Sequence, residues 1–403
     1  MLILYTHLPG KHRSQYFCRH PVVMSFVVVT HAPLSYHGGK IYGYAPYIRE
    51  MNIWCRHVSS AIFVCPAEAY NEQDLLMALE APARFRHIVI PDFNLLGWRN
   101  VLKAIPAILV CSVKIIWAML LASHIHLRCP GNMGLLGCVW QIFFPWKPKT
   151  AKYAGNWDWN SQQPTTYRWQ QRILSNTWLT HRMQALVYGE WPGATRNIKA
   201  FFTATYSEAD KVPTPPRPLK GSIQLMFAGT FSPGKQPLLS VQVAQALQQA
   251  GHPVVLHMFG AGEQWQAVAD YVQAHDLSQV VQLHGNQPAS VVKAHFQQSH
   301  FLLFISRSEG WPKVVAESMF WGCVPITSAV SCVPQMAGQG SRGTLVTDKV
   351  EEIVAAIENW LQHPAAYAAA SQEGMTWSRQ FTLEKFETEI VALLGKQATP
   401  NRH

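Results

Sequence analysis

Residues 301–317 read FLLFISRSEGWPKVVAE, five apolar residues that lead through a polar loop into a second apolar stretch. The apolar run is typical of a buried strand, and Pro312 stands where a helix would begin. In an open parallel α/β sheet, ligands bind at the loop that follows the carboxyl end of a strand. The stretch therefore predicts an α/β sheet with a ligand site between Ile305 and Lys313.

Two carboxylates flank this loop. Glu309 precedes the expected helix and Glu317 follows eight positions later, roughly 12 Å along an ideal helix. A carboxylate accepts hydrogen bonds from neighbouring sugar hydroxyls, and free N–H groups at a helix start can receive phosphate oxygens. The spacing favours a ligand with a hexose at one end, a ribose at the other and a pyrophosphate between them.

These residues, together with Gly322-Cys323-Val324-Pro325-Ile326, resemble the donor motif of glycosyltransferase family 4, the glycosyl transferases group 1. The resemblance implies an α/β fold of the GT-B type, in which two Rossmann-like, doubly wound parallel-sheet domains face an interdomain cleft. It implies that Glu309 contacts the transferred sugar and Glu317 the ribose. Further donor contacts are expected from Arg307, Gly310, Trp311, Pro312 and Lys313.

A second loop supports the same interpretation. Residues 227–235 read FAGTFSPGK and place Gly229 and Lys235 between an expected strand and an expected helix. A lysine there can neutralise the charge of a departing nucleoside diphosphate, and Lys235 matches the family's phosphate-binding lysine. The family commonly has an arginine where this chain has Thr230, and Arg307 and Arg128 are the candidates to substitute for it.

Gly260 and Gly262 follow the next expected strand, either to let the backbone approach the nucleotide or to form a plain turn. The chain contains no Asp-x-Asp pair to hold a divalent cation. We therefore expect no metal and no cofactor, with a nucleoside-diphosphate sugar as co-substrate.

The first half of the chain resembles the family in outline only. An expected strand at 25–30, Gly38-Gly39 and an expected helix at 42–54 resemble the family's first glycine loop, although a glycine pair is also common in a structural turn. His126 and Arg128 lie at the end of an expected strand that begins at 124, and by alternation they share one face. The resemblance places His126 near the transferred sugar, against the alternative of a core histidine. Arg128, Asn132 and the weaker candidates His31 and His37 are expected on the acceptor side.

The chain divides at residues 211–220, which contain four prolines in a short polar run and favour neither helix nor strand. We expect an N-terminal extension at 1–21, an acceptor-side domain at 22–210, a donor domain at 221–378, and a C-terminal crossover helix with its tail at 379–403. Residues 147–163 are expected to be irregular. The eight cysteines form no C-x-x-C pair and are expected to be reduced core thiols of a cytoplasmic protein.

The excess of positive over negative charge is confined to residues 1–210. Residues 1–210 hold 20 Lys and Arg against 10 Asp and Glu, whereas residues 211–403 hold 13 of each. Such asymmetry favours contact with something anionic, a membrane surface or a phosphorylated acceptor, or else serves solubility. The apolar stretch 104–122 approaches the length of a membrane span but contains Pro106 and Lys114, which favours a buried or interfacial helix.

These patterns predict a retaining, metal-independent glycosyltransferase that builds a cell-surface polysaccharide from a glycan or lipid-linked acceptor, in the cytoplasm or at the inner face of the membrane. Another GT-B enzyme, such as a nucleotide-sugar epimerase or a phosphorylase, shares the fold and stays open. So does a non-catalytic protein that binds membrane or glycan. A dinucleotide oxidoreductase is disfavoured because no G-x-G-x-x-G follows a strand, and no nucleic-acid-binding module is recognisable.

Overall fold

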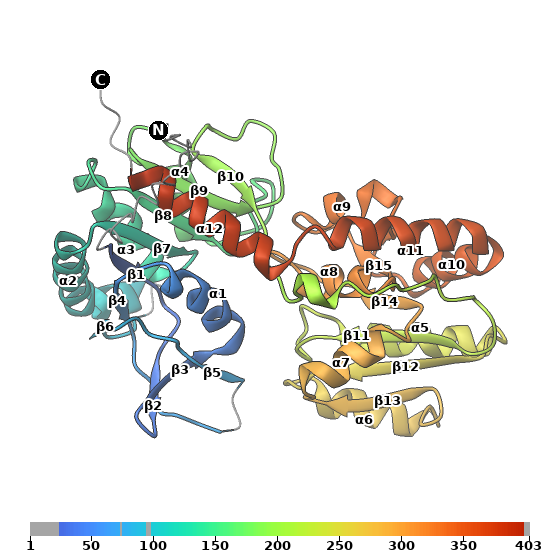
Figure 1. The fold of residues 1–403 in the computed structure, drawn as a ribbon. Helices are drawn as coiled ribbons and strands as arrows, with labels where there is room; N and C mark the ends of the chain where they lie inside the picture. Colours follow the sequence, from blue (N-terminus) through green and yellow to red (C-terminus); the bar gives the residue numbers. More distant parts are fainter. Residues whose placement is uncertain (1–23, 73–74, 94–97, 399–403) are drawn as a thin grey trace, which may run out of the picture.

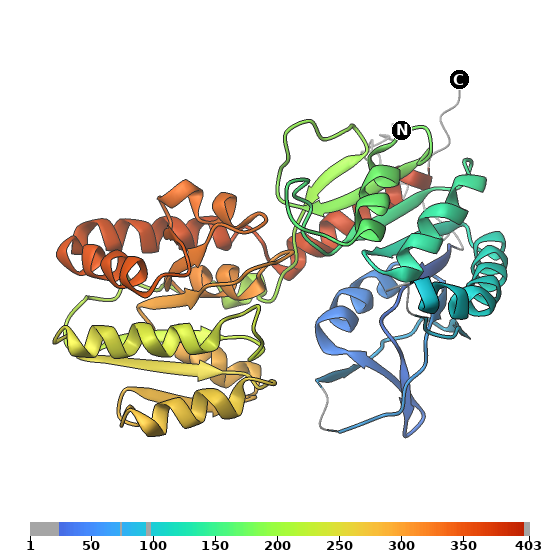
Figure 2. The ribbon, with the colours of Figure 1, turned by 180° about the vertical axis from the view of Figure 1, so that it is seen from behind.

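The computed structural model describes residues 24–72, 75–93 and 98–398, which form two α/β domains side by side (Figures 1 and 2). The expected extension at 1–21 lies outside the described residues. Within them, each domain is built on one parallel sheet, six-stranded in the second domain and seven-stranded in the first. The predicted α/β class with two doubly wound sheets is confirmed.

The first domain has the sheet order β10-β9-β8-β7-β1-β4-β6. The interior strand β1 pairs with β7 on one side and β4 on the other, each in parallel. The strands are β1 (Ser25–Val29), β4 (Ser60–Cys65), β6 (Arg84–Val89), β7 (His124–Cys129), β8 (Lys149–Tyr153), β9 (Met183–Tyr188) and β10 (Ile198–Phe201). The helices that cover it are α1 (Ala45–Arg56), α2 (Trp98–Leu121), α3 (Asn132–Trp140) with the 3₁₀ turn η1 (Gln141–Phe143), and α4 (Thr165–Ser175).

The second domain has the sheet order β13-β12-β11-β14-β15-β16. Its strands are β11 (Ile223–Ala228), β12 (Val254–Phe259), β13 (Val281–Gly285), β14 (Phe301–Phe304), β15 (Val324–Ser328) and β16 (Thr344–Val346). Its helices are α5 (Pro237–Gln249), α6 (Trp265–Ala274), α7 (Ala289–Phe296), α8 (Lys313–Phe320), α9 (Val333–Met336), α10 (Val350–Gln362) and α11 (Pro364–Ser378), with the 3₁₀ turn η3 (Gly338–Gly340).

Alternation of side chains along each central strand builds two cores per domain. In β1, Val27 and Val29 face the core under α2, α3 and α4, whereas Phe26 and Val28 face the core under α1. The second sheet is covered in the same way, by α5, α6 and α10 on one face and by α7, α8 and α9 on the other.

The last helix, α12 (Leu383–Ala398), returns to the first domain (Figure 1). Its buried residues Phe386, Ile390, Leu393 and Leu394 belong to the same core as Phe26 of β1. Between the two sheets the chain passes through residues 202–222, which contain only the 3₁₀ turn η2 (Glu208–Asp210) among their described elements.

Two sequence interpretations of the first domain are wrong. Residues 147–163 were expected to be irregular, but they contain β8, whose Lys149 and Lys152 are buried. The region after β1 was expected to run through a glycine loop directly into a helix. Instead it forms a small antiparallel sheet of β2 (Ser35–His37), β3 (Lys40–Tyr44) and β5 (Leu76–Ala78), and α1 begins only afterwards.

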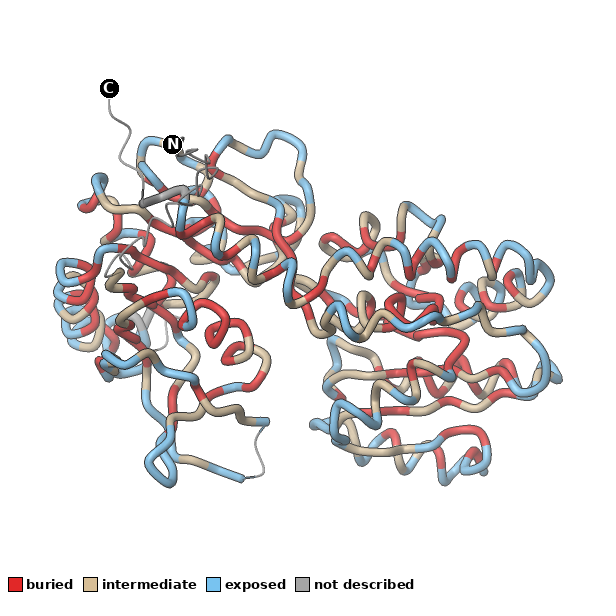
Figure 3. Tube along the Cα trace, viewed as in Figure 1, coloured by how far each residue is buried: buried red, intermediate tan, exposed pale blue. Residues whose placement is uncertain are grey.

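Helix α2 is long and apolar enough to cross a membrane by length and composition alone. It lies against the first sheet, however, with Cys111, Ile115, Ala118 and Met119 buried in the core under that face. Its opposite face is exposed between Leu102 and Leu121 (Figure 3). The seven cysteines among the described residues are free and buried, in agreement with reduced core thiols.

Candidate functional site

Two neighbouring strands of the second domain place the predicted donor residues together. Strands β11 and β14 are paired in parallel, so the loops at their carboxyl ends, 229–236 and 305–312, meet at one edge of the sheet. There Lys235 forms an ion pair with Glu309, whose Oε1 also accepts a hydrogen bond from the Ser306 hydroxyl at 2.6 Å. The Lys235 ammonium lies 4.9 Å from the centre of the Phe304 ring.

The glycine loops are packed backbone to backbone beside this pair. A Cβ on Gly260 or Gly262 would collide with the backbone of Gly229 or Phe231, and both glycines have positive φ. The Phe231 N–H donates to the Ala261 carbonyl at 3.0 Å. The space around Gly229 itself is open. Glycine is therefore required at positions 260 and 262 for the loop after β12 to pack against the loop after β11. The open space beside Gly229 is left free for a ligand.

Arg307 lies beside the loop that carries Lys235. Its N–H donates to the Gly234 carbonyl at 2.9 Å, and its guanidinium reaches the Gln236 side chain at 3.5 Å. Both Arg307 and Thr230 are exposed. Arg307 thus stands within the loop pair where the missing family arginine was expected to act.

The start of α8 joins the two domains. Gly310 lies against the Ala154 carbonyl of the first domain, with no room for a side chain. Pro312 is the N-cap of α8, which begins at Lys313. The Lys313 ammonium is 4.0 Å from a carboxylate oxygen of Glu50 in α1. Gly310 and Lys313 therefore make contacts between the domains.

Glu317 has a different set of neighbours from Glu309. Its Oε1 accepts a hydrogen bond of 2.6 Å from the Thr205 hydroxyl. The two residues line a cavity of about 10 Å³, too small for a sugar. In this structure Glu317 is half-buried and faces the interdomain segment, where the Thr205 hydroxyl occupies its Oε1.

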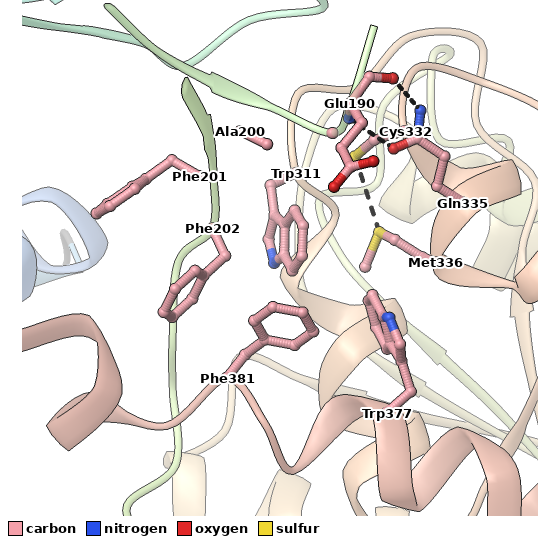
Figure 4. A pocket seen from close by; sticks show the side chains of 11 residues that line it. Glu190, Ala200, Phe201, Phe202, Trp311, Cys332, Gln335, Met336, Trp377 and Phe381 are labelled. Carbon is pink, nitrogen blue, oxygen red and sulfur yellow. Dashed lines mark hydrogen bonds between the residues drawn. The ribbon is translucent and has the colours of Figure 1, made fainter. Parts of the chain in front are cut away.

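The Trp311 side chain, an expected donor contact, packs among aromatic residues, with ring centroids 6.1 Å from Trp377 and 5.6 Å from Phe381. It lines an interdomain cavity of about 440 Å³ together with Phe202, Trp377 and Phe381 (Figure 4). Glu190 and Gln335 lie at the other side of this cavity, where Gln335 bonds the Glu190 backbone. The indole ring packs in the aromatic contact between the domains.

A buried charge cluster that the sequence did not reveal lies at the same junction. Glu50 of α1 accepts hydrogen bonds from Lys152 at 2.8 Å, from Arg128 at 3.3 Å and from the Thr203 hydroxyl at 2.5 Å. Burial raises the pKa of Glu50, but Lys152, Arg128 and Lys313 outweigh it and hold that pKa well below its ordinary value. Burial lowers the pKa of Lys152 to about 8 against the pull of Glu50. We conclude that Glu50 is ionised and paired at neutral pH.

His126 is a core histidine, the alternative that the sequence left open. It is buried, lies between Phe26 and Trp54, and has Nδ1 2.8 Å from the Thr150 hydroxyl. Burial, together with His124 and Arg128, lowers its pKa well below the ordinary value. The predicted strand is present as β7, but the face that carries His126 points into the core under α1.

Gly38 and Gly39 form the turn of the hairpin between β2 and β3. Both have positive φ, which the type I′ hairpin turn requires at its two central residues. A Cβ on either glycine would have no atom within 4 Å. They meet a conformational need of the turn. The structural-turn alternative therefore explains why the pair is there.

The acceptor-side candidates that share one cavity are His31 and Asn132. They line a space of about 570 Å³ in the first domain with Asp92, Gly131 and Tyr167. Burial lowers the pKa of His31, Arg128 lowers it further, and Asp92 opposes them. The cavity offers a neutral imidazole, a carboxylate and an amide to a hydroxylated ligand.

Comparisons with known proteins identify the fold and a family pattern in the second domain. Residues 212–377 match the family model described as Glycosyl transferases group 1. HepE of Anabaena, solved with UDP and glucose, has a TM-score of 0.62 and 13% identity over 93% of this chain and 100% of that one. The fold is GT-B. The second GT-B domain thus carries the group 1 pattern, including the Lys235 and Glu309 loops.

Two further structures support the fold over nearly the whole chain. Sucrose-phosphate synthase of Thermosynechococcus elongatus has a TM-score of 0.62 at 16% identity, covering 93% of this chain and 98% of that one. WaaG, a glycosyltransferase involved in lipopolysaccharide biosynthesis, has a TM-score of 0.59 at 11% identity, covering 92% and 99%. No curated protein gives a significant match to the sequence.

Proposed function

We propose that this protein is a retaining, metal-independent glycosyltransferase. It moves a sugar from a nucleoside-diphosphate sugar to a glycan or lipid-linked acceptor, in the synthesis of a cell-surface polysaccharide. The observation that carries the proposal is the Lys235–Glu309 pair at the adjoining ends of β11 and β14, within the domain that matches the group 1 family.

The pair is poised for a change of partner. A donor diphosphate beside Lys235 replaces Glu309 as the counter-ion of the ammonium, which frees the Glu309 carboxylate to accept hydrogen bonds from the sugar hydroxyls. Arg307, on the adjacent loop, supplies a second positive charge to the phosphates. Because these charges are fixed before the reaction, they stabilise the leaving diphosphate at little reorganisation cost.

Retention fits an attack from the same face of the sugar as the departing diphosphate. The acceptor hydroxyl loses its proton to a diphosphate oxygen. The bond between the anomeric carbon and the leaving diphosphate oxygen breaks, and the new glycosidic bond forms on the same face of the sugar. In this proposal Lys235, Glu309 and the backbone around Gly310 orient and stabilise rather than transfer protons.

The direct test is a donor screen. Uridine, guanosine and adenosine diphosphate sugars are compared by thermal shift, and the best donor is then incubated with candidate acceptors in EDTA and analysed by mass spectrometry. Transfer of one sugar to the acceptor supports the proposal. An isomerised donor with no transfer would instead identify an epimerase, and no donor binding at all would favour a non-catalytic protein.

The role of Glu317 gives a sharper prediction. Glu317→Gln is expected to weaken nucleotide binding by about tenfold, the order of a lost charge-assisted hydrogen bond of 1.5–3 kcal/mol. Isothermal titration with the nucleoside diphosphate measures it, and Glu373→Gln on α11 is the matched control. Equal affinity in Glu317→Gln and wild type would show that the ribose does not reach this carboxylate.

The membrane part of the proposal depends on α2. Its exposed side carries apolar residues three or four positions apart, the spacing of one helix face: Leu102, Ile105, Leu109, Val113, Trp117 and Leu120. The exposed Arg86 guanidinium lies 5.4 Å from the Trp117 ring, and Lys103 is exposed on the same helix. An apolar stripe beside cations, on the half of the chain that holds the charge excess, suits an anionic bilayer surface on the cytoplasmic side.

A double substitution tests this surface without touching the core. Leu109 is 62% exposed and Val113 67% exposed, so Leu109→Glu/Val113→Glu is expected to leave folding intact. It removes two apolar groups worth roughly 1.5 kcal/mol each on burial, and liposome binding should fall by at least tenfold. Cosedimentation with phosphatidylglycerol vesicles at low and high salt measures it, with Val391→Glu on α12 as control. Unchanged binding would exclude α2 as the contact.

A further inference from the structure

Three histidines of the second domain converge at one place. They are His257 in β12, His284 in β13 and His295 in α7, and one ring nitrogen from each lies within 4.8 Å of the others. The closest approach joins His257 Nδ1 to His284 Nε2, at 3.1 Å. All three side chains are partly exposed.

The fold brings these distant residues together. In β12, Leu256 and Met258 point into the core under α5 and α6, so His257 points to the opposite face, which α7 covers. The register of β12 and β13 shifts between Met258 and Phe259, and His284 lies in that irregular stretch. His295 is the penultimate residue of α7 and completes the group from above the sheet.

The rings are held in place by their neighbours. The Phe259 ring stacks on His284 with an interplanar angle of 9° and a centroid distance of 4.5 Å. The Gln224 side-chain oxygen lies 3.1 Å from His257 Nε2. With Nε2–H donating to Gln224, the lone pair of His257 is on Nδ1 and faces the other two rings. A hydrogen bond of this kind is the usual outer partner that orients a metal-binding histidine.

The protonation state also suits metal binding. Burial, followed by the charges of His295 and His284, lowers the pKa of His257 to about 4. The pKa values of His284 and His295 are lowered by burial as well. The three imidazoles are therefore neutral at pH 7, and only the neutral ring can offer a lone pair.

We propose that His257, His284 and His295 form a binding site for a Zn²⁺-like transition metal ion. Imidazole nitrogens suit zinc and its neighbours, whereas Mg²⁺ and Ca²⁺ require oxygen ligands. Zinc–nitrogen bonds of about 2.0–2.1 Å in a tetrahedron separate the ligand atoms by about 3.3 Å. The His257–His284 distance is already near that value, and rotation of the surface ring of His295 supplies the rest. The partial exposure of the three rings leaves the fourth position to water.

The three histidines include none of the residues assigned to the proposed reaction. Lys235 and Glu309 lie at the ends of β11 and β14, whereas the histidines connect β12, the edge strand β13 and α7. A bound ion ties α7 to the edge of the sheet and stabilises the donor domain. Metal-independent transfer and a stabilising metal are therefore compatible, and they are tested by different measurements.

The test measures metal binding, with no sugar transfer involved. Tag-free full-length protein, stripped with a chelator, is dialysed against Zn²⁺, and bound metal is counted by mass spectrometry. Co²⁺ is added separately, because a tetrahedral site gives intense visible absorption. We expect one Zn²⁺ per chain, the Co²⁺ bands, and an increase in melting temperature on metal addition.

Single variants assign the ligands. His284→Gln and His295→Gln are expected to weaken Zn²⁺ binding more than tenfold and to abolish the Co²⁺ bands, whereas His363→Gln, at the surface end of α10, should bind as wild type does. Melting curves in chelator show that each variant is folded. Absence of stoichiometric binding in the wild type, or binding that survives both substitutions, would overturn the proposal. Neither result bears on nucleotide-sugar binding.

Discussion

Replacing Lys235 with alanine is expected to lower kcat by about 10²–10³-fold, the usual effect of removing one preorganised group that faces developing charge. The ammonium is paired with Glu309 after the carboxyl end of β11, and in the proposed mechanism its loss removes the cation that faces the leaving diphosphate. Donor affinity should fall much less, because Arg307 and the backbone of the paired loops still hold the phosphates. Initial rates at saturating donor, with donor Kd from titration, separate the two effects.

Lys349→Ala, at the start of α10, is the matched control, and Lys235→Arg is the conservative variant. Arginine keeps the charge and should recover part of kcat. If Lys235→Ala turns over as fast as wild type, Lys235 does not act on the diphosphate and the proposed mechanism fails. If instead kcat is unchanged and only Kd rises, the lysine binds the donor without favouring the transition state.

Glu50→Gln is expected to destabilise the protein by about 3–5 kcal/mol, the cost of removing one partner from a buried ion pair. The substitution keeps the size of the side chain but leaves Lys152, only 2% exposed, and Arg128 without their counter-charge. Urea denaturation followed by tryptophan fluorescence measures the shift. Glu80→Gln is the control, because the Glu80–Arg56 pair is exposed and should contribute about 0–1 kcal/mol.

The effect of Glu50 also depends on pH, with a defined sign. Its folded pKa is depressed below the ordinary value of 4.5, so its contribution is complete above that value and declines as the pH falls toward the folded pKa. The difference in stability between wild type and Glu50→Gln should therefore shrink below about pH 4. A constant difference from pH 3 to pH 7 would contradict an ionised Glu50.

The second domain could be predicted from its sequence because its signals are local. Local sequence determines the conformation of the run 301–305, of the helix start at Pro312 and of the glycine-bearing loops. Parallel pairing of β11 with β14 then brings Lys235 to Glu309. Trp311 and Glu317 were harder, because their neighbours come from the first domain and from the segment before the linker. A sequence motif identifies the residues of a loop. The directions of their side chains depend also on contacts with the other domain, which the motif does not contain.

The first domain shows why local patterns fail. Strand β8 carries Lys149 and Lys152, which break the apolar run of a buried strand, yet Lys149 donates to the Gln141 and Phe144 carbonyls and Lys152 to Glu50. The Gln141 and Phe144 acceptors are backbone carbonyls, which no sequence pattern marks, and Glu50 is 102 residues away from Lys152. The alternation that aligned His126 with Arg128 was sound, but it does not say which face of a strand meets the core.

The return of α12 to the first domain has a consequence for how the chain is made. The first domain's core under α1 includes Phe386, Ile390, Leu393 and Leu394, which the ribosome synthesises after the whole second domain. While translation proceeds, Phe26 and Trp54 lack these partners, so the first domain finishes folding only when nearly the entire chain has emerged. Its completion is thereby coupled to successful synthesis of the domain that carries the donor motif.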